Sequence, residues 1–310
     1  MGPAVVHGDI GGLQAQVIQH GTLLHRRVAD VDGSCCAGRM TVAVDEDLGL
    51  FGPGSVTWRV HIEPVMWVAG FRALLLQSLE PRVMRGTFQN SALFDPARAW
   101  SRFQRTVEFV GTRTFGSTDD VERSAARVRK LHATLRGHDP DTGETFRLDE
   151  PENLLWVHAT EVESYAHIGQ RVGILTGPEA DEYLAESVRA ARVIGLIDAP
   201  SSRAEMRAYF DRRRPDLRLT DEARQATMNL FAPKGQAPRV VKAAMPVVAT
   251  LALATLPRWA RRHFGLPGLP TTDVGTTLTL RALRVASDML PDIPAPPNID
   301  RARRSVRGLS

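Results

Sequence analysis

The chain has 310 residues, of which 43% are hydrophobic and 24% charged, an ordinary balance for a globular protein that buries a large core. Arginines dominate the basic residues, so the pI is about 9.5 although the formal net charge is only +4, which permits contact with an anionic surface without requiring it. The two cysteines are adjacent, at Cys35 and Cys36, and no Cys-x-x-Cys pair occurs, so a disulfide framework and a structural zinc site are excluded.

Two further features bear on the location of the protein. We expect no secretory signal peptide, because the N-terminus lacks a basic segment followed by a continuous apolar run. The longest apolar run, Ala243–Leu256, covers about 14 residues, too few to cross a bilayer. It predicts a core helix or, as the alternative, a helix that lies on a membrane surface. A reducing, cytoplasmic location is expected, with peripheral membrane contact left open.

The N-terminal part of the chain begins with a stretch of little periodicity. Residues 1–39 are expected to form a poorly ordered extension that carries no chemistry. A helix is predicted at 55–79, apolar nearly all round, which is the pattern of a buried central helix. Pro64 is expected to kink this helix or to mark its true start, and Pro81 to end it.

Two helices with clear start and stop signals follow, at 97–115 and 118–136. On the first of them, Arg102 and Thr106 are four residues apart and therefore lie on one face, with Arg105 beside Thr106. The second helix carries several basic residues on its outer faces. An Asp-Pro-Asp-Thr-Gly segment after it is a strong turn signal.

The most informative stretch is the predicted helix at 153–171, for which Asn153 is a plausible N-cap. Its apolar residues recur at helical spacing and predict one buried face: Leu154, Leu155, Val157, Val162 and Tyr165. His158 lies within this apolar run, where one ring nitrogen must be satisfied and the other is free to bind a metal or to move a proton. The ordinary alternative is a core histidine hydrogen-bonded to a backbone carbonyl. His167 lies on the opposite side of the helix, so the two histidines do not share one metal.

The remaining pattern is also helical. Further helices are predicted at 177–196, 201–210, 220–231, 239–256, 259–264 and 271–290. The tail at 291–310, rich in proline and arginine, is expected to be disordered. No strand ladder or internal repeat is visible. The sequence therefore predicts an all-α protein whose single globular domain, at 40–290, holds about ten helices.

Several functional classes lack their sequence motifs. No P-loop, no Gly-x-Gly-x-x-Gly loop after a strand and no Gly-x-Ser-x-Gly elbow occurs. His-Glu-x-x-His and Glu-x-x-His pairs are also missing, which argues against a zinc protease and a ferritin-like di-iron bundle. The arginine run at 212–214 is explained by a solvated helix end, where cations complement the helix dipole. Nucleic acid is therefore not an expected partner.

Six short segments occur in an order that is itself informative. They are L-L-L-Q-S-L-E-P (74–81), F-Q-N-S-A-L-F-D-P (88–96), R-F-Q-R-T (102–106), F-G-S (115–117), R-V-R-K-L-H-A-T-L-R-G (127–137) and L-L-W-V-H-A-T (154–160). This succession resembles the oxygenase MpaB family, whose catalytic domain is shared with latex-clearing (rubber) oxygenases. The resemblance covers about residues 50–265.

The resemblance implies an all-helical fold around a haem-sized apolar pocket, with b-type haem and a histidine as axial iron ligand. It matches His158 to that ligand, and Arg102 and Thr106 to an Arg-x-x-x-Thr pair of the haem pocket. Arg105 stands where the rubber-cleaving branch has a lysine, so a lysine-capped resting state is not expected. His132 matches a recurrent family histidine, with a distal-pocket position and a propionate contact both open.

We therefore expect a haem-b oxidoreductase, an oxygenase or oxidase of a hydrophobic small molecule, with dioxygen bound opposite His158. Arg102, Arg105 and Arg127 are candidates to bind the haem propionates. For Arg102 and Thr106 the ordinary alternatives are an interhelical salt bridge and a back-bonded helical threonine. Two rival functions stay open: a helical protein that binds haem or a lipid-like ligand without turnover, and a helical domain that uses the apolar slot for a partner. The substrate, the electron donor and the oligomeric state are not predicted.

Overall fold

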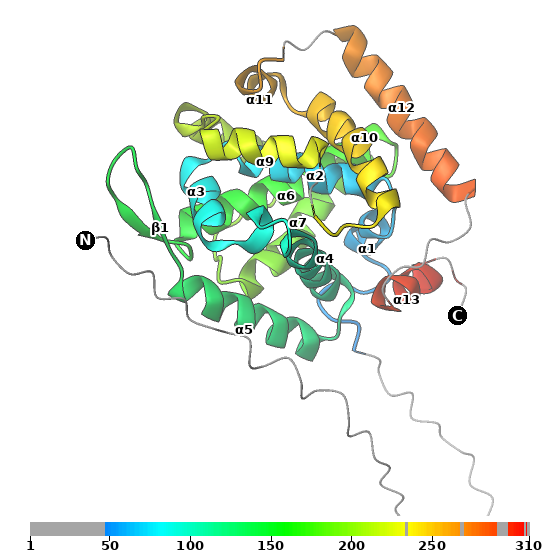
Figure 1. The fold of residues 1–310 in the computed structure, drawn as a ribbon. Coiled ribbons are helices and arrows are strands. Elements are labelled where there is room, and N and C mark those ends of the chain that lie inside the picture. Colours follow the sequence, from blue (N-terminus) through cyan, green and yellow to red (C-terminus); the bar gives the residue numbers. More distant parts are fainter. Residues whose placement is uncertain (1–46, 233–234, 267–269, 290–296, 307, 309–310) are drawn as a thin grey trace, which may run out of the picture. The chain divides into compact units, whose positions relative to one another are not determined.

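The structure, a computed structural model, describes residues 47–232, 235–266, 270–289, 297–306 and 308. The expected N-terminal extension at 1–39 lies outside the described residues. All described residues belong to one compact unit. Figure 1 shows helices α2 and α6 at the centre of this unit, with the other helices around them.

Thirteen α-helices make up nearly all regular structure in the described residues, which confirms the all-α fold class. They are α1 (Val56–His61), α2 (Met66–Gln77), α3 (Pro81–Asn90), α4 (Ala99–Phe115), α5 (Thr118–Thr134), α6 (Pro151–Arg171), α7 (Gly177–Val193), α8 (Arg203–Arg213), α9 (Asp221–Phe231), α10 (Arg239–Thr255), α11 (Arg258–His263), α12 (Pro270–Met289) and α13 (Pro297–Val306). Two short 3-10 turns lie at Ala92–Phe94 and Arg214–Asp216.

The described residues contain three more helices than the sequence analysis predicts, and two of these three arise around prolines in the first half of the chain. The helix predicted at 55–79 is two helices, α1 and α2, and α2 begins just after Pro64, as expected for a residue that cannot donate a backbone hydrogen bond. Pro81 begins α3 instead of only ending the helix before it. Proline suits the first helical position, and the Glu80 side chain caps the helix by accepting from the Arg82 backbone N–H at 3.0 Å.

The third additional helix, α13, lies in the tail that was expected to be disordered, so that prediction is wrong for Pro297–Val306. Ala302 is fully buried in a small apolar cluster with Trp58 and Phe115. The Arg301 guanidinium donates to the Phe115 carbonyl at 3.0 Å. This helix is held by tertiary contacts, because a ten-residue helix is marginal by itself in water.

The expectation of no strands is wrong for one hairpin, formed by β1 (Arg136–His138) and β2 (Thr145–Arg147). The predicted turn before α6 is the loop of this hairpin, and Gly143 supplies the positive φ of 73° that it requires. Gly137 pairs with Phe146, whose ring lies where a β-carbon on residue 137 would stand. The hairpin is too short to alter the fold class.

The start of α6 also differs from the prediction. Glu150, not Asn153, is the N-cap, and Pro151 stands at the first helical position. The Asn153 side chain is buried and donates to the Arg147 carbonyl at 3.2 Å. It therefore ties the helix to the hairpin.

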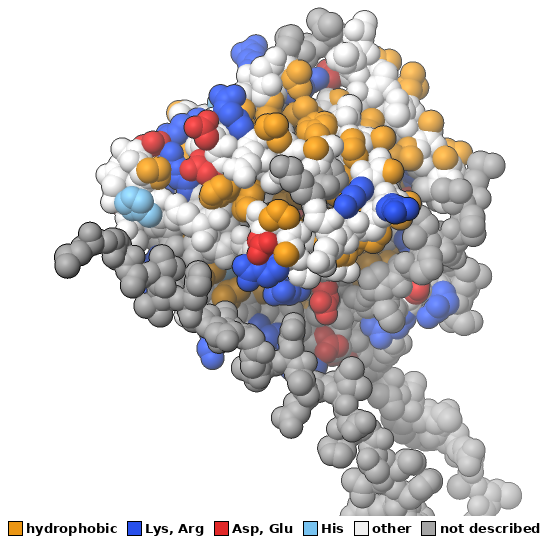
Figure 2. All heavy atoms as spheres, viewed as in Figure 1, with side chains coloured by type: hydrophobic (Ala, Val, Ile, Leu, Met, Phe, Trp, Pro, Cys, Tyr) orange, Lys and Arg blue, Asp and Glu red, His pale blue; other side chains and the backbone are white. Residues whose placement is uncertain are grey.

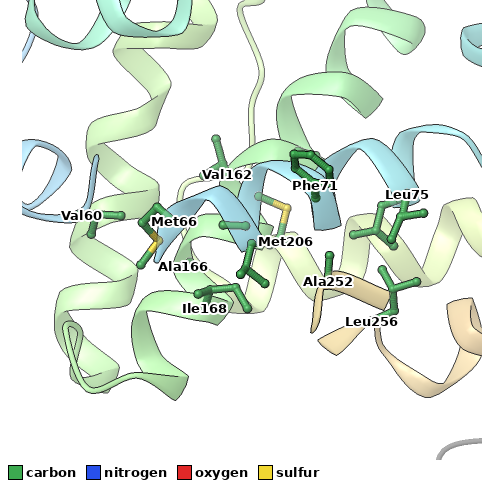
Figure 3. Packing of buried hydrophobic residues seen from close by; sticks show 14 of the residues in the cluster. Val60, Met66, Phe71, Leu75, Val162, Ala166, Ile168, Met206, Ala252 and Leu256 are labelled. Carbon is green, nitrogen blue, oxygen red and sulfur yellow. The ribbon is translucent and has the colours of Figure 1, made fainter. Parts of the chain in front are cut away.

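The hydrophobic core is built where α2 crosses α6, with α10 packed on α2 and α7 packed on α6. Figure 3 shows Phe71 and Leu75 of α2 among Val162, Ala166 and Ile168 of α6 and Ala252 and Leu256 from the α10 end. Burying one such large apolar side chain contributes about 1.5–3 kcal/mol. In the described part of the chain, no helix combines the length and apolar character needed to cross a membrane.

One glycine makes a close contact that a stability measurement can test. Gly49 has φ +69°, and a β-carbon there would lie 1.9 Å from the Gly116 carbonyl oxygen, on the turn between α4 and α5. Gly49→Ala is therefore expected to lower the free energy of unfolding by about 1–3 kcal/mol, because both backbone strain and the clash are imposed. Urea unfolding measures this change. Gly54→Ala is the control, since nothing lies within 4 Å of its β-carbon position, and an equal loss in both variants would contradict the prediction.

Candidate functional site

A cavity of about 1390 Å³ lies along one side of α6. Its wall comes from α2, α4, α5 and α6, with a contribution from α10, and most of its side chains are apolar. This volume exceeds the about 300–1,000 Å³ that is usual for a small-molecule pocket, so it has room for a prosthetic group and a substrate together.

Helix α6 presents one complete stripe to this cavity: Leu154, Val157, His158, Glu161 and Tyr165. The spacing of three and four residues places them on one face. The opposite side of α6 is also buried, and it packs into the core through Trp156, Ala159, Val162 and Ala166. The sequence predicts one buried face, whereas α6 has two: one lines the cavity and the other packs into the core. Val162, which is predicted on the same face as His158, lies on the core side.

His158 is 1% exposed, and neither of its ring nitrogens has a hydrogen-bond partner among the described residues. The hydrogen bond to a backbone carbonyl that the ordinary interpretation requires is therefore not observed among the described residues. Buried polar atoms nearly always have a partner, and leaving one unsatisfied costs about 1–3 kcal/mol. An unsatisfied imidazole beside a large cavity is available to bind a ligand.

The protonation state of His158 suits metal binding. Burial lowers the pKa of His158 to about 4, with a further lowering by the Arg113 charge that the nearby Glu161 carboxylate opposes. At neutral pH the imidazole is therefore uncharged and keeps one nitrogen lone pair. This is the form in which histidine binds a metal.

A buried ion pair lies beside His158. Glu161 is three residues further along α6, and its carboxylate accepts from the guanidinium of Arg113, which is 6% exposed and comes from the end of α4. Burial pushes the pKa of Glu161 up, but the charge and hydrogen bond of Arg113 together hold this pKa below its ordinary value. The pair therefore carries both charges at neutral pH.

Aromatic residues surround this ion pair. The His61 Nε2 lies 2.9 Å from the Tyr183 hydroxyl, and the His61 ring stacks on Tyr165 with the ring centroids 4.3 Å apart. Burial lowers the pKa of His61 to about 4. The sequence analysis missed this cluster, because its members come from α1, α4, α6 and α7. The sequence held one indication of this cluster: Glu161 places a carboxylate one turn from His158 on an otherwise apolar helix face.

On the α4 side of the cavity lie Arg102 and Thr106. The Arg102 Nη1 donates to the Thr106 hydroxyl at 2.5 Å, and that hydroxyl also lies 3.4 Å from the Arg102 carbonyl. Of the two ordinary alternatives considered for these residues, the threonine that is hydrogen-bonded back to its own helix is observed. The interhelical salt bridge of Arg102 is not observed, since Arg102 forms no ion pair with any described residue. Burial and then the neighbouring Arg105 charge lower the pKa of Arg102.

The other predicted site residues, Arg105, Arg127 and His132, also line this cavity. Arg105 and Arg127 are exposed, and neither forms an ion pair within the described part of the chain. Burial lowers the pKa of His132, and the Arg102 charge lowers it further. The structure therefore brings all six predicted residues to one cavity, whereas no direct hydrogen bond joins His158 to any of the other five. Their functional roles stay predictions.

The effect of Arg102 on His132 links α4 to α5 and can be measured. Arg102→Ala removes a positive charge that disfavours protonation of His132, so the pKa of His132 is expected to rise. It should remain below its ordinary value, because burial is the larger cause. Titration of the His132 imidazole by NMR measures the change. Lys130→Ala, an exposed position on the same helix, is the control; an unchanged His132 pKa in the Arg102 variant would contradict the prediction.

Within the residues that the structure describes, no three His, Cys, Asp or Glu side chains are grouped so as to hold a metal ion. Gln77, another polar residue in an apolar segment, lines the cavity and donates to the Val157 carbonyl at 3.3 Å. Its polar side chain thus has a partner on α6.

The domain is thus a helical bundle with a large, mostly apolar cavity beside its central helix, and bundles build ligand sites between facing helices in this way. Comparison with known families defines it further. Residues 58–288 match the model of the family described as "ER-bound oxygenase mpaB/B'/Rubber oxygenase, catalytic domain". The chain belongs to this family of oxygenase catalytic domains, and the match includes all six predicted site residues and extends into α12. No curated protein and no solved structure gives a significant match.

Proposed function

We propose that the protein is a haem-b-dependent oxygenase that acts on a hydrophobic small molecule, with His158 as the axial iron ligand. The observation that carries this proposal is the buried His158 imidazole, which has no hydrogen-bond partner among the described residues and lies in the wall of the large cavity. Membership of an oxygenase family supports the reaction class.

The residues of the cavity fit a haem. The cavity is large and mostly apolar, as a porphyrin requires, and the neutral His158 imidazole in its wall has no hydrogen-bond partner among the described residues and can bind iron. Arg102, Arg105 and Arg127 supply cations for two propionates, and none of the three is paired with a carboxylate in the described residues. Haem bound there would supply the iron redox chemistry that reactions with dioxygen need.

The chain's own side chains have distinct tasks in this proposal. His158 would bind as the uncharged imidazole, the form that its lowered pKa favours at neutral pH. The charges of Glu161 and Arg113 neutralise each other beside His158, so the pair adds no net charge next to the imidazole. The apolar wall excludes water and orients a hydrophobic substrate, while Arg102 and Thr106 offer hydrogen-bond donors at an otherwise apolar surface.

Spectroscopy of the purified full-length protein tests the proposal. After expression with ample haem precursor, the protein is expected to show a Soret band, to bind carbon monoxide when reduced and to consume dioxygen with a hydrophobic substrate. A colourless protein would contradict haem binding. A haem protein whose reduced form neither binds carbon monoxide nor consumes dioxygen would instead support the alternative, a haem or lipid carrier without turnover.

A further inference from the structure

Helices α10 and α12 pack against each other and expose apolar faces. On α10, Val240, Ala243, Ala244 and Val247 are exposed at a spacing of three and four residues, which places them on one outward face. The opposite side of α10 is buried in the core through Ala249 and Ala252, and Leu251, one turn after Val247, is also buried, so the exposed face covers the first half of the helix. The outward face of this surface helix is therefore apolar, where a globular protein normally has polar side chains.

Helix α12 shows the same arrangement. Val274, Leu278, Ala282 and Val285 are exposed at helical spacing, while Leu280 on the other side is fully buried. The exposed fractions of Val240, Val247, Val274, Leu278 and Val285 lie between 60% and 74%. Figure 2 shows hydrophobic side chains gathered over the region of α10 and α12, with Arg and Lys side chains beside them. Contiguous apolar surface of this kind marks an interaction site.

The positive charge of this region favours an anionic partner. Residues 239–289 contain seven Lys and Arg residues against two Asp residues, a formal charge of +5, whereas the whole chain carries only +4. The rest of the chain is thus slightly negative, and the positive excess lies in this segment. Arg239, Lys242, Arg258 and Arg262 have no ion pair among the described residues. Other arginines of the domain, such as Arg85, are held by carboxylates.

We propose that α10 and α12 form a docking face for an anionic lipid bilayer. The exposed valines and leucine would enter the boundary between headgroups and acyl chains, and the unpaired cations would lie at the level of the lipid phosphates. A second copy of the chain suits this face less well, because symmetric pairing would bring together two surfaces whose cations Arg239, Lys242, Arg258 and Arg262 have no ion pair among the described residues. Met245, also on α10, lines the cavity, so one helix has both the docking face and part of the cavity wall.

Vesicle flotation with the full-length protein tests the proposal. The wild-type protein is expected to float with vesicles of equal parts phosphatidylcholine and phosphatidylglycerol, and at least about tenfold less with pure phosphatidylcholine, since each basic residue near an anionic surface adds about 1 kcal/mol. Binding should weaken as salt is raised. Equal flotation with both vesicle types, or none with either, would overturn the proposal. Haem content does not enter this measurement, so its result is independent of the proposed oxygenase function.

Substitutions locate the binding to the two helices. Val247→Glu with Leu278→Glu is expected to reduce binding to the anionic vesicles at least about tenfold, because it places carboxylates where apolar side chains meet the bilayer. Ile197→Glu, at an 84% exposed apolar position between α7 and α8, is the matched control and should bind as the wild type does. Val274→Glu with Val285→Glu, confined to α12, provides a second test if the first variant does not fold.

Two results would assign the face to another partner. Unchanged vesicle binding by both folded glutamate variants would place the lipid contact elsewhere on the protein. Light scattering after size-exclusion chromatography gives the oligomeric state in the absence of lipid. If the wild type is a dimer that Val247→Glu with Leu278→Glu converts to a monomer, a second copy covers the face and the lipid proposal is overturned.

Discussion

His158→Ala is expected to abolish the Soret band of the purified protein and to reduce its bound haem by more than about tenfold. The imidazole is the only candidate iron ligand that the sequence analysis places in the cavity, and its two ring nitrogens have no other partner in the described residues. Loss of the ligand itself should exceed the about 10–100-fold cost of removing a residue that merely orients one. Haem per protein, measured as the pyridine complex, and the absorbance spectrum give the result.

The same helix supplies the control for this experiment. His167 lies nine residues further along α6, outside the cavity wall, and burial lowers its pKa to about 3. His167→Ala removes the same kind of side chain from α6 and should retain the Soret band. Added imidazole is expected to restore haem absorbance to the His158→Ala protein, because the deletion leaves space for it in the cavity. A His158→Ala protein with the wild-type spectrum would refute the ligand assignment.

Glu161→Gln is expected to lower the free energy of unfolding by about 3–5 kcal/mol, because it leaves the Arg113 guanidinium buried without a counter-charge. Urea unfolding measures this loss. Arg113→Met with Glu161→Leu removes both charges and should recover most of it. Glu122→Gln, which breaks the exposed pair with Arg129, is the control and should cost less than about 1 kcal/mol. Equal losses at the two sites would contradict the prediction.

The pH dependence of stability gives a second measurement of the Arg113–Glu161 pair. The pKa of Glu161 is lower in the folded protein than its ordinary value of 4.5, so the unfolded chain binds a proton more readily. The stabilisation is therefore complete above pH 4.5 and is lost as the pH falls through the lowered pKa. Glu161→Gln should remove this part of the acid dependence.

Much of the helical organisation could be predicted from the sequence because its signals are local. Ser117 caps α5, and Thr176 and Glu179 form a capping box on α7, each within four residues of the helix start. The same local rules failed at Pro81, where the residue that ends one helix also begins the next. They failed again at α13, which depends on contacts with Trp58 and Phe115, far away in the chain.

The candidate site likewise has some features that follow from local sequence and others that depend on long-range contacts. Arg102 and Thr106 share a helix face by their spacing, and the hydrogen bond between them follows from it. His158 was recognised as unusual within an apolar stretch, but its lack of any partner became visible only in the folded chain. The ion pair of Glu161 with Arg113 joins residues 48 apart, and the contact of His61 with Tyr183 joins residues 122 apart.

The sequence by itself thus determined the all-α fold and the positions of most helices, because helical periodicity and capping act over three or four residues. The resemblance to an oxygenase family added the assignment of His158. Only the tertiary structure decided that α6 is buried on both sides and that, within the residues it describes, His158 has no hydrogen-bond partner and the apolar faces of α10 and α12 remain exposed. These properties depend on which helices pack together, and packing joins residues that no local pattern relates.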